Sequence, residues 1–143
     1  MGDTLRTLRR FLLVFLVAGA SVTLAELLLA GHTEDVWQLV PIVLLVGGIP
    51  LTVACAVKPR PSTVLAFRGV MVAYFVGGLV GVYLHVSAKM EFALEGQPDL
   101  AGFAPLIEAM EGSSPPVLAP LAMGGLALVG IAWTYRYTRT DAA

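Results

Sequence analysis

The chain is short of charge, of cysteine and of asparagine. Only 13% of its 143 residues are Asp, Glu, Lys or Arg, whereas a water-soluble domain carries about a quarter. Cys55 is the single cysteine, which excludes an internal disulfide and a cysteine-based zinc or iron–sulfur site. With no asparagine there is no acceptor for N-glycosylation. The remaining polar surface is too small for a protein that folds in water.

Catalytic and nucleic-acid-binding signatures are missing as well. The sequence has no HExxH pattern and no pair of Glu-x-x-His motifs. Its few basic residues form short flanks without interleaved aromatic side chains, so a nucleic-acid partner is not expected.

Apolar residues, at 57% of the chain, gather in four long runs. A helix needs about 20 apolar residues to cross a bilayer. The runs Phe11–Ala30, Trp37–Val57, Val64–Val86 and Pro116–Tyr135 meet that length. They predict an all-α fold, an integral membrane four-helix bundle, built as a single domain over residues 1–143.

The charges between the runs are sorted by sign. Eight of the nine basic residues fall on one side, which the positive-inside rule assigns to the cytoplasm. Both termini are therefore predicted in the cytoplasm, in a multi-pass protein of the cytoplasmic (inner) membrane. These eight are Arg6, Arg9, Arg10, Lys58, Arg60, Arg68, Arg136 and Arg139; the other side holds Lys89 with Glu34, Asp35, Glu91, Glu95, Asp99, Glu108 and Glu111.

Residues near the ends of the runs carry two further expectations. Trp37 and Tyr83 should lie at the outer membrane boundary, and the aromatic residues of the segment 133–137 at the inner one. Arg68 should extend its long side chain to the cytoplasmic boundary. The start of the chain also resembles a signal peptide with a cleavage site at Ala18–Ala20, but the apolar run continues beyond it and favours a retained span.

The outer connection between the third and fourth spans is long. No helix breaker occurs before Gly96, so the third helix is expected to continue through Glu95. The segment Pro105–Glu111 predicts a short amphipathic helix, which would lie on the membrane or over the mouth of the bundle. Its apolar side would comprise Phe103, Leu106, Ile107 and Met110.

Small residues repeat along the third span and are candidates for close helix packing. They are Gly69, Ala73, Gly77, Gly78 and Gly81. Such residues let another helix approach closely. We interpret them as packing inside the bundle, with an oligomer interface as the alternative.

Glu26 is the one acidic residue inside a span, and it is expected to face the interior of the bundle. His85 shares a helical stripe with Tyr74 and points toward the outer mouth if the glycines mark the packed face. His32 follows the first span closely. The candidate ligand-binding residues are therefore Glu26, His85, His32 and Tyr74.

These residues also allow a metal site. Glu26, His32, His85, Glu91 and Glu95 offer imidazole and carboxylate ligands, which suit zinc, iron or manganese. The two histidines could instead ligate one haem, or bond to backbone and water. A divalent metal or haem thus remains an open cofactor, and Glu91 with Glu95 fits a solvated face better than a catalytic pair.

Two functions from different classes remain open, with a membrane enzyme that uses the outer carboxylates as a third. The first is an accessory or scaffold subunit, or a homo-oligomer, whose acidic outer surface binds a membrane-protein partner. The alternative is a protein that handles an ion, a metal or haem through an outward-facing site at Glu26 and His85. In both, the lipid bilayer is the first partner.

Overall fold

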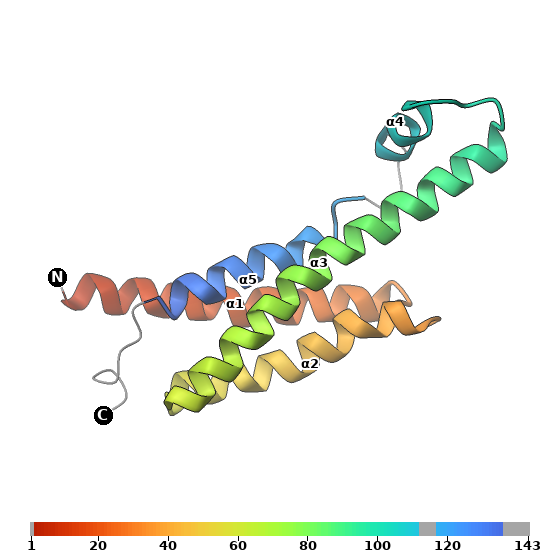
Figure 1. Ribbon diagram of the computed structural model, residues 1–143. Helices are drawn as coiled ribbons and strands as arrows, with labels where there is room; N and C mark the ends of the chain where they lie inside the picture. Colours follow the sequence, from red (N-terminus) through yellow and green to blue (C-terminus); the bar gives the residue numbers. More distant parts are fainter. Residues whose placement is uncertain (1, 112–116, 136–143) are drawn as a thin grey trace.

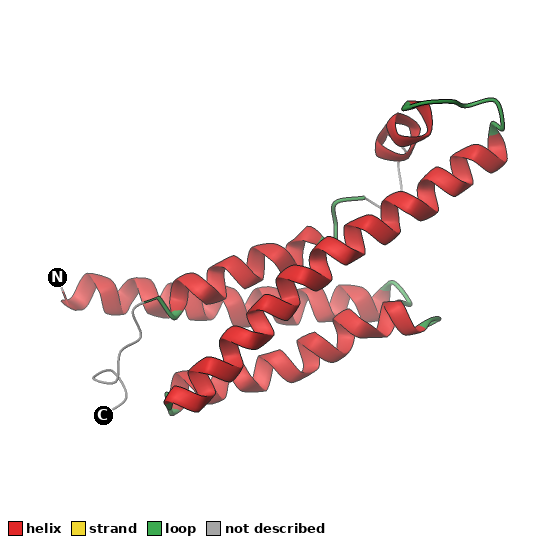
Figure 2. Cartoon of the chain, viewed as in Figure 1, coloured by secondary structure: helices red, strands yellow, loops and turns green. Residues whose placement is uncertain are grey.

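The computed structural model describes residues 2–111 and 117–135 and shows an all-α chain (Figures 1 and 2). Its described part forms α1 (Gly2–Leu29), α2 (Val36–Val57), α3 (Pro61–Gly96), α4 (Ala104–Glu111) and α5 (Leu121–Trp133). The all-α prediction is confirmed. The predicted extension of the third helix and the short helix after it are present as the far part of α3 and as α4.

Three helices of the described part are long and apolar enough to cross a membrane: Asp3–Leu29, Val36–Val57 and Pro61–Gly96. The 22 residues of α2 alone extend about 33 Å, which matches a hydrocarbon core of about 30 Å. Large apolar side chains such as Phe11, Leu65 and Leu29 point outward and are 72%, 72% and 89% exposed. A surface of this kind indicates a membrane protein.

The fourth predicted span, 116–135, is found as a shorter helix. The 13 residues of α5 extend about 20 Å. Before them the chain makes tight turns, in which the Leu121 and Ala122 amides donate to the Leu118 and Ala119 carbonyls at 2.9 and 3.1 Å. Pro120 explains the late start, because its ring disfavours helical backbone at the preceding residue and it has no N–H to donate.

Local sequence signals account for the other helix ends. Asp35 caps α2 by accepting a 2.9 Å hydrogen bond from the Gln38 amide. At the start of α3, Pro61 takes the first helical position and the Thr63 hydroxyl accepts from the Arg60 amide at 2.8 Å. Gly96 is the last residue of α3, as expected from its weak helix propensity.

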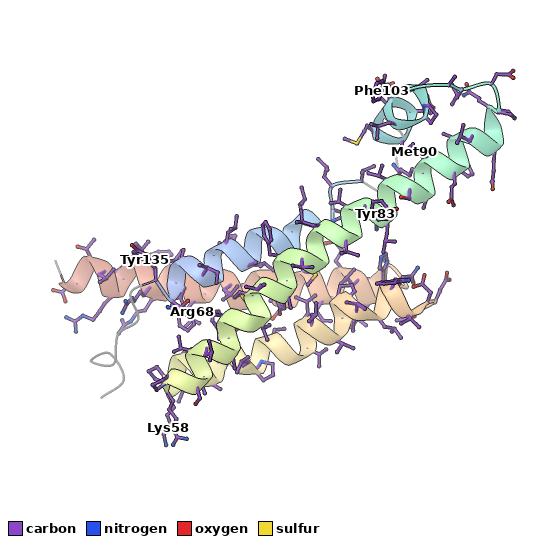
Figure 3. The ribbon with its side chains drawn as sticks, in the orientation of Figure 1. Lys58, Arg68, Tyr83, Met90, Phe103 and Tyr135 are labelled. Carbon is purple, nitrogen blue, oxygen red and sulfur yellow. The ribbon has the colours of Figure 1, made fainter. Side chains whose placement is uncertain are left out.

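The long helices pack side by side, with α3 crossing the others at an angle (Figure 1). α3 contacts α2, α4 and α5, while α1 contacts α2 and α5. The start of α1, the α2–α3 turn and the end of α5 lie toward one end, together with Arg6, Arg9, Arg10, Lys58 and Arg60; we call it the basic end (Figures 1 and 3). The α1–α2 loop, the far part of α3 and α4 lie toward the other, which we call the acidic end.

The core fills the space between α1, α2, α3 and α5. Leu16, Leu45, Phe67 and Met71 are all at most 1% exposed. The rings of Phe67 and Trp133 meet edge to face, with centroids 5.3 Å apart. Trp133 lies in this core, where it packs against α3 and is only 4% exposed. Tyr83 and Trp37 are exposed. Their predicted positions at the membrane boundaries stay predictions.

The small residues of α3 divide between different neighbours. A Cβ atom added to Gly78 would lie 2.9 Å from the Pro120 carbonyl oxygen, and one added to Gly81 would lie 2.7 Å from Pro120 Cβ. A Cβ atom added to Gly77 would lie 3.4 Å from Leu44 Cδ1 of α2. Ala73 is half-buried, whereas Gly69 is exposed and has nothing within 4 Å of its Cβ position. Gly78 and Gly81 thus serve the α3–α5 contact inside the molecule.

Arg68 makes a different contact from the one expected. Its guanidinium donates to the carbonyl oxygen of Thr134 at 2.6 Å and to the Thr134 hydroxyl at 3.4 Å. Thr134 is the buried C-cap of α5. A cation at that point satisfies an otherwise free carbonyl and lies at the negative end of the helix dipole. Arg68 therefore caps α5, a contact that the sequence did not predict.

Candidate functional site

The two histidines of the chain meet at the acidic end. His32 lies in the loop between α1 and α2, and His85 lies in α3. Their ring centroids are 6.2 Å apart and the ring planes are inclined by 29°. Both side chains are half-buried, so water and small ions can reach them. This contact joins two parts of the molecule that are far apart in sequence.

The end of α1 explains where His32 is placed. Gly31 has a φ of +69°, the left-handed conformation that glycine adopts without steric cost. The His32 amide donates to the Leu27 carbonyl at 3.0 Å, and the Gly31 amide donates to the Leu28 carbonyl at 3.2 Å. This pair of hydrogen bonds is the Schellman motif that ends many helices. It turns the chain sharply and directs His32 toward α3.

The Asp35 cap fixes the other side of the same loop. The Glu34 amide donates to Gln38 Oε1 at 2.9 Å, while Asp35 accepts from the Gln38 amide. Asp35 is thus occupied in holding the start of α2. The His32 loop is held at both ends by hydrogen bonds rather than left as a free connection.

Glu26 lies outside this pair. Its side chain is exposed on the last turn of α1, in a shallow surface depression lined by Val22, Ala25, Leu29 and Ala30. The expectation that it faces the bundle interior is therefore wrong. The buried side of α1 is marked instead by Leu16 and Ala20. Among the described side chains, no hydrogen bond or ion pair joins Glu26 to His85.

The five predicted metal ligands do not form one site. Across residues 2–111 and 117–135, no three His, Cys, Asp or Glu side chains lie close enough to hold a metal ion. Glu91 and Glu95 are exposed farther along α3. Of the five, the structure brings only His32 and His85 into ring contact.

Tyr74 belongs to the core. It is 1% exposed, and a Cβ atom added to Gly48 of α2 would lie 2.1 Å from its hydroxyl oxygen. The ring therefore fills the space above Gly48. Eleven residues of helix separate Tyr74 from His85, a rise of about 16 Å. Tyr74 acts in packing α2 against α3 and is not near the histidines.

The far part of α3 and α4 form an arm at the acidic end, residues 86–111 (Figure 3). α4 lies against α3 through Pro105 and Ala109, which are buried. The predicted apolar side is therefore not the packed side, and Phe103 and Ile107 are 80% and 55% exposed. The arm also exposes five carboxylates, namely Glu91, Glu95, Asp99, Glu108 and Glu111.

Comparison with protein-family models, curated proteins and solved structures finds no significant match for this chain. The site is therefore interpreted from its own geometry.

Sequence reasoning missed one structural role. The Arg68 contact with Thr134 was not foreseen, although an arginine at the start of an apolar helix signals some buried or terminal acceptor. The sequence did place His32 and His85 together among the candidate ligands, but it added Glu26, Glu91, Glu95 and Tyr74 and did not give the geometry of the histidine pair. A useful signal was present in Gly31, which marks a helix end and a sharp turn just before His32.

Proposed function

We propose that this chain is a four-span integral membrane protein, in which α5 and its preceding turns complete a bundle with α1, α2 and α3. The contacts α1–α2, α2–α3, α3–α5 and α5–α1 support this arrangement, because they close a ring. The whole chain, 1–143, would form one domain. The basic end would face the cytoplasm with both termini, in the cytoplasmic (inner) membrane.

Within that membrane, the chain would act as an accessory or scaffold subunit, or as a homo-oligomer. The observation that carries this proposal is the arm, which extends α3 beyond the other helices (Figure 1). The arm presents exposed carboxylates beside exposed apolar side chains. Aromatic and aliphatic side chains within a polar rim are typical of protein interfaces. The partner surface would be another membrane protein, or a second copy, that offers basic and apolar side chains.

The test compares complexes in native membranes. The variant Glu91→Gln with Glu95→Gln and Phe103→Ser removes charge and apolar contact from the arm without adding a positive charge. We expect it to run as a single chain after mild detergent extraction, whereas the original chain runs as a larger complex. The matched control is Asp3→Asn, which removes an exposed carboxylate at the basic end. A single-chain mass for the original protein, both in lipid and in detergent, would contradict the proposal.

A second candidate function is the handling of an ion, a metal or haem at an outward-facing site. The sequence predicted such a site at Glu26 and His85. The observation that favours this function is the contact of His85 with His32. Metal analysis and an absorption spectrum of the purified protein test it. His85→Ala should alter ligand content, and Glu26→Gln tests whether the exposed carboxylate takes part. A protein with no bound metal, no haem absorption and no metal affinity would remove this candidate.

A further inference from the structure

We propose that His32 and His85 together form a binding site for one divalent transition metal of the Zn²⁺ or Cu²⁺ type. The inference rests on the second candidate function and names its ligands. It replaces the predicted five-residue ligand set with two imidazoles. The bound ion would hold the α1–α2 loop against α3.

The geometry suits a shared ion. Zinc–imidazole bonds are about 2.0–2.1 Å long, which puts the centroids of two rings on one ion roughly 5 to 6 Å apart. The observed separation is 6.2 Å. A shared ion would require the two side chains to turn so that one nitrogen of each ring faces it, since the ring planes are inclined by only 29°. The two rings come from separate elements whose positions are set by the Schellman turn at Gly31 and by the helix α3.

The chemistry of the pair also fits this class of metal. Neutral imidazole is a common ligand for zinc and copper, and it favours them over magnesium or calcium, which take oxygen ligands. Both rings are half-buried and accessible from water. Since no third ligand from the described residues completes the set, water would occupy the remaining positions.

The composition of the chain makes the site unusually easy to test. The sequence has two histidines and one cysteine, and Cys55 is buried in α2. Metal binding by imidazole can therefore come only from His32 and His85, provided that any affinity tag is removed. Among the described residues, no Asp or Glu side chain joins the two histidines in a group of three that could hold a metal ion.

The experiment titrates Zn²⁺ into the untagged full-length chain in detergent, followed by calorimetry. We expect one ion per chain, and at least a tenfold weaker affinity in both His32→Gln and His85→Gln. The control Asp3→Asn removes an exposed carboxylate at the basic end, away from both histidines, and should retain the original affinity within about threefold. Zn²⁺ should also raise the thermal unfolding temperature of the original chain but not of either histidine variant, because only the folded form holds both rings together.

The outcomes separate the site from the broader function. If Zn²⁺ binds but one histidine variant keeps the original affinity, the two-imidazole site is wrong while an ion-handling function survives elsewhere. If the original chain does not bind Zn²⁺ at all, the two-imidazole site is wrong, and the broader function is then decided by the metal content and the haem absorption of the purified protein. Should a variant fail to fold, Cu²⁺ added to the original chain decides by electron paramagnetic resonance. Coupling to two nitrogens supports the site, and coupling to one or none overturns it.

Discussion

Arg68 is the residue whose role changed most between sequence and structure. A charged group near the end of an apolar helix is costly unless it finds acceptors, and here it finds the carbonyl of the buried C-cap residue Thr134. The same contact ties the first turns of α3 to the last turn of α5. The Arg68 guanidinium thereby gains hydrogen-bond acceptors, and the C-terminus of α5 gains a donor for its last carbonyl.

Replacing Arg68 by methionine should destabilise the fold by about 2 kcal/mol, because hydrogen bonds to charged groups are worth about 1.5–3 kcal/mol. Arg68→Lys should recover part of the loss, since an ammonium can reach one acceptor but not both. Thermal unfolding in one detergent, followed by circular dichroism, measures this. Equal stability of the methionine variant and the original chain would show that the contact contributes nothing.

Gly78 and Gly69 form a matched pair on the same helix. Alanine at Gly78 brings a methyl group within 2.9 Å of the Pro120 carbonyl oxygen, whereas alanine at Gly69 meets nothing within 4 Å. We expect Gly78→Ala to lower stability by about 1–3 kcal/mol through overpacking. Gly69→Ala should be neutral or slightly stabilising, because alanine favours helix. The same unfolding assay applies, and a larger loss at Gly69 would contradict the assigned α3–α5 contact.

The α1–α2 connection is an element with a defined geometry rather than a flexible loop. The Schellman turn at one side and the Asp35 cap at the other hold its few residues. That geometry is what places His32 against α3. The position of His32 against α3 therefore depends on these backbone hydrogen bonds as well as on the contact between the two imidazole rings.

Gly31→Ala tests the turn. A left-handed φ costs alanine about 1 kcal/mol, although there is open space around the Cβ position. We expect a small loss of stability together with weaker Zn²⁺ affinity, because His32 shifts. The control is Gly96→Ala, which also has open space but no positive φ. If both variants behave alike, the turn does not determine the position of His32.

Across the whole molecule, the packing of the helices puts the basic segments at one end and the acidic segments at the other, as the order of charges along the sequence predicts. The start of α1, the α2–α3 turn and the end of α5 share one end, while the α1–α2 loop and the arm share the other (Figure 1). A single orientation in the membrane then places every short basic flank of the described chain in the same compartment.

Cysteine labelling tests that orientation. Cys55 is buried, so the original chain should not react with a membrane-impermeant maleimide. Glu95→Cys at the end of α3 should react in intact cells, whereas Ser62→Cys near the α2–α3 turn should react only after lysis. Both positions are exposed in the fold. The reverse pattern would place the basic end outside the cytoplasm.

Much of the fold was predictable because it depends on local properties. Apolar run length predicted α2 and the end of α1, although α1 begins at Gly2, before the predicted start at Phe11. The lack of a breaker before Gly96 predicted where α3 ends. The start of α5 was placed too early, since the apolar run continues through the prolines that prevent a regular helix. Apolarity reports where a chain can cross lipid, but not where its backbone becomes helical.

The sequence by itself determined the environment, the helix count in outline and the separation of charge, since these follow from composition and from neighbours along the chain. Only the tertiary structure decided which faces meet. In that structure Glu26 is exposed, Trp133 is buried, Arg68 donates hydrogen bonds to Thr134, and the two histidine rings lie close together. The rotation of one helix against another depends on side-chain packing across the whole bundle, and in a membrane every face of a helix is apolar enough to be the buried one.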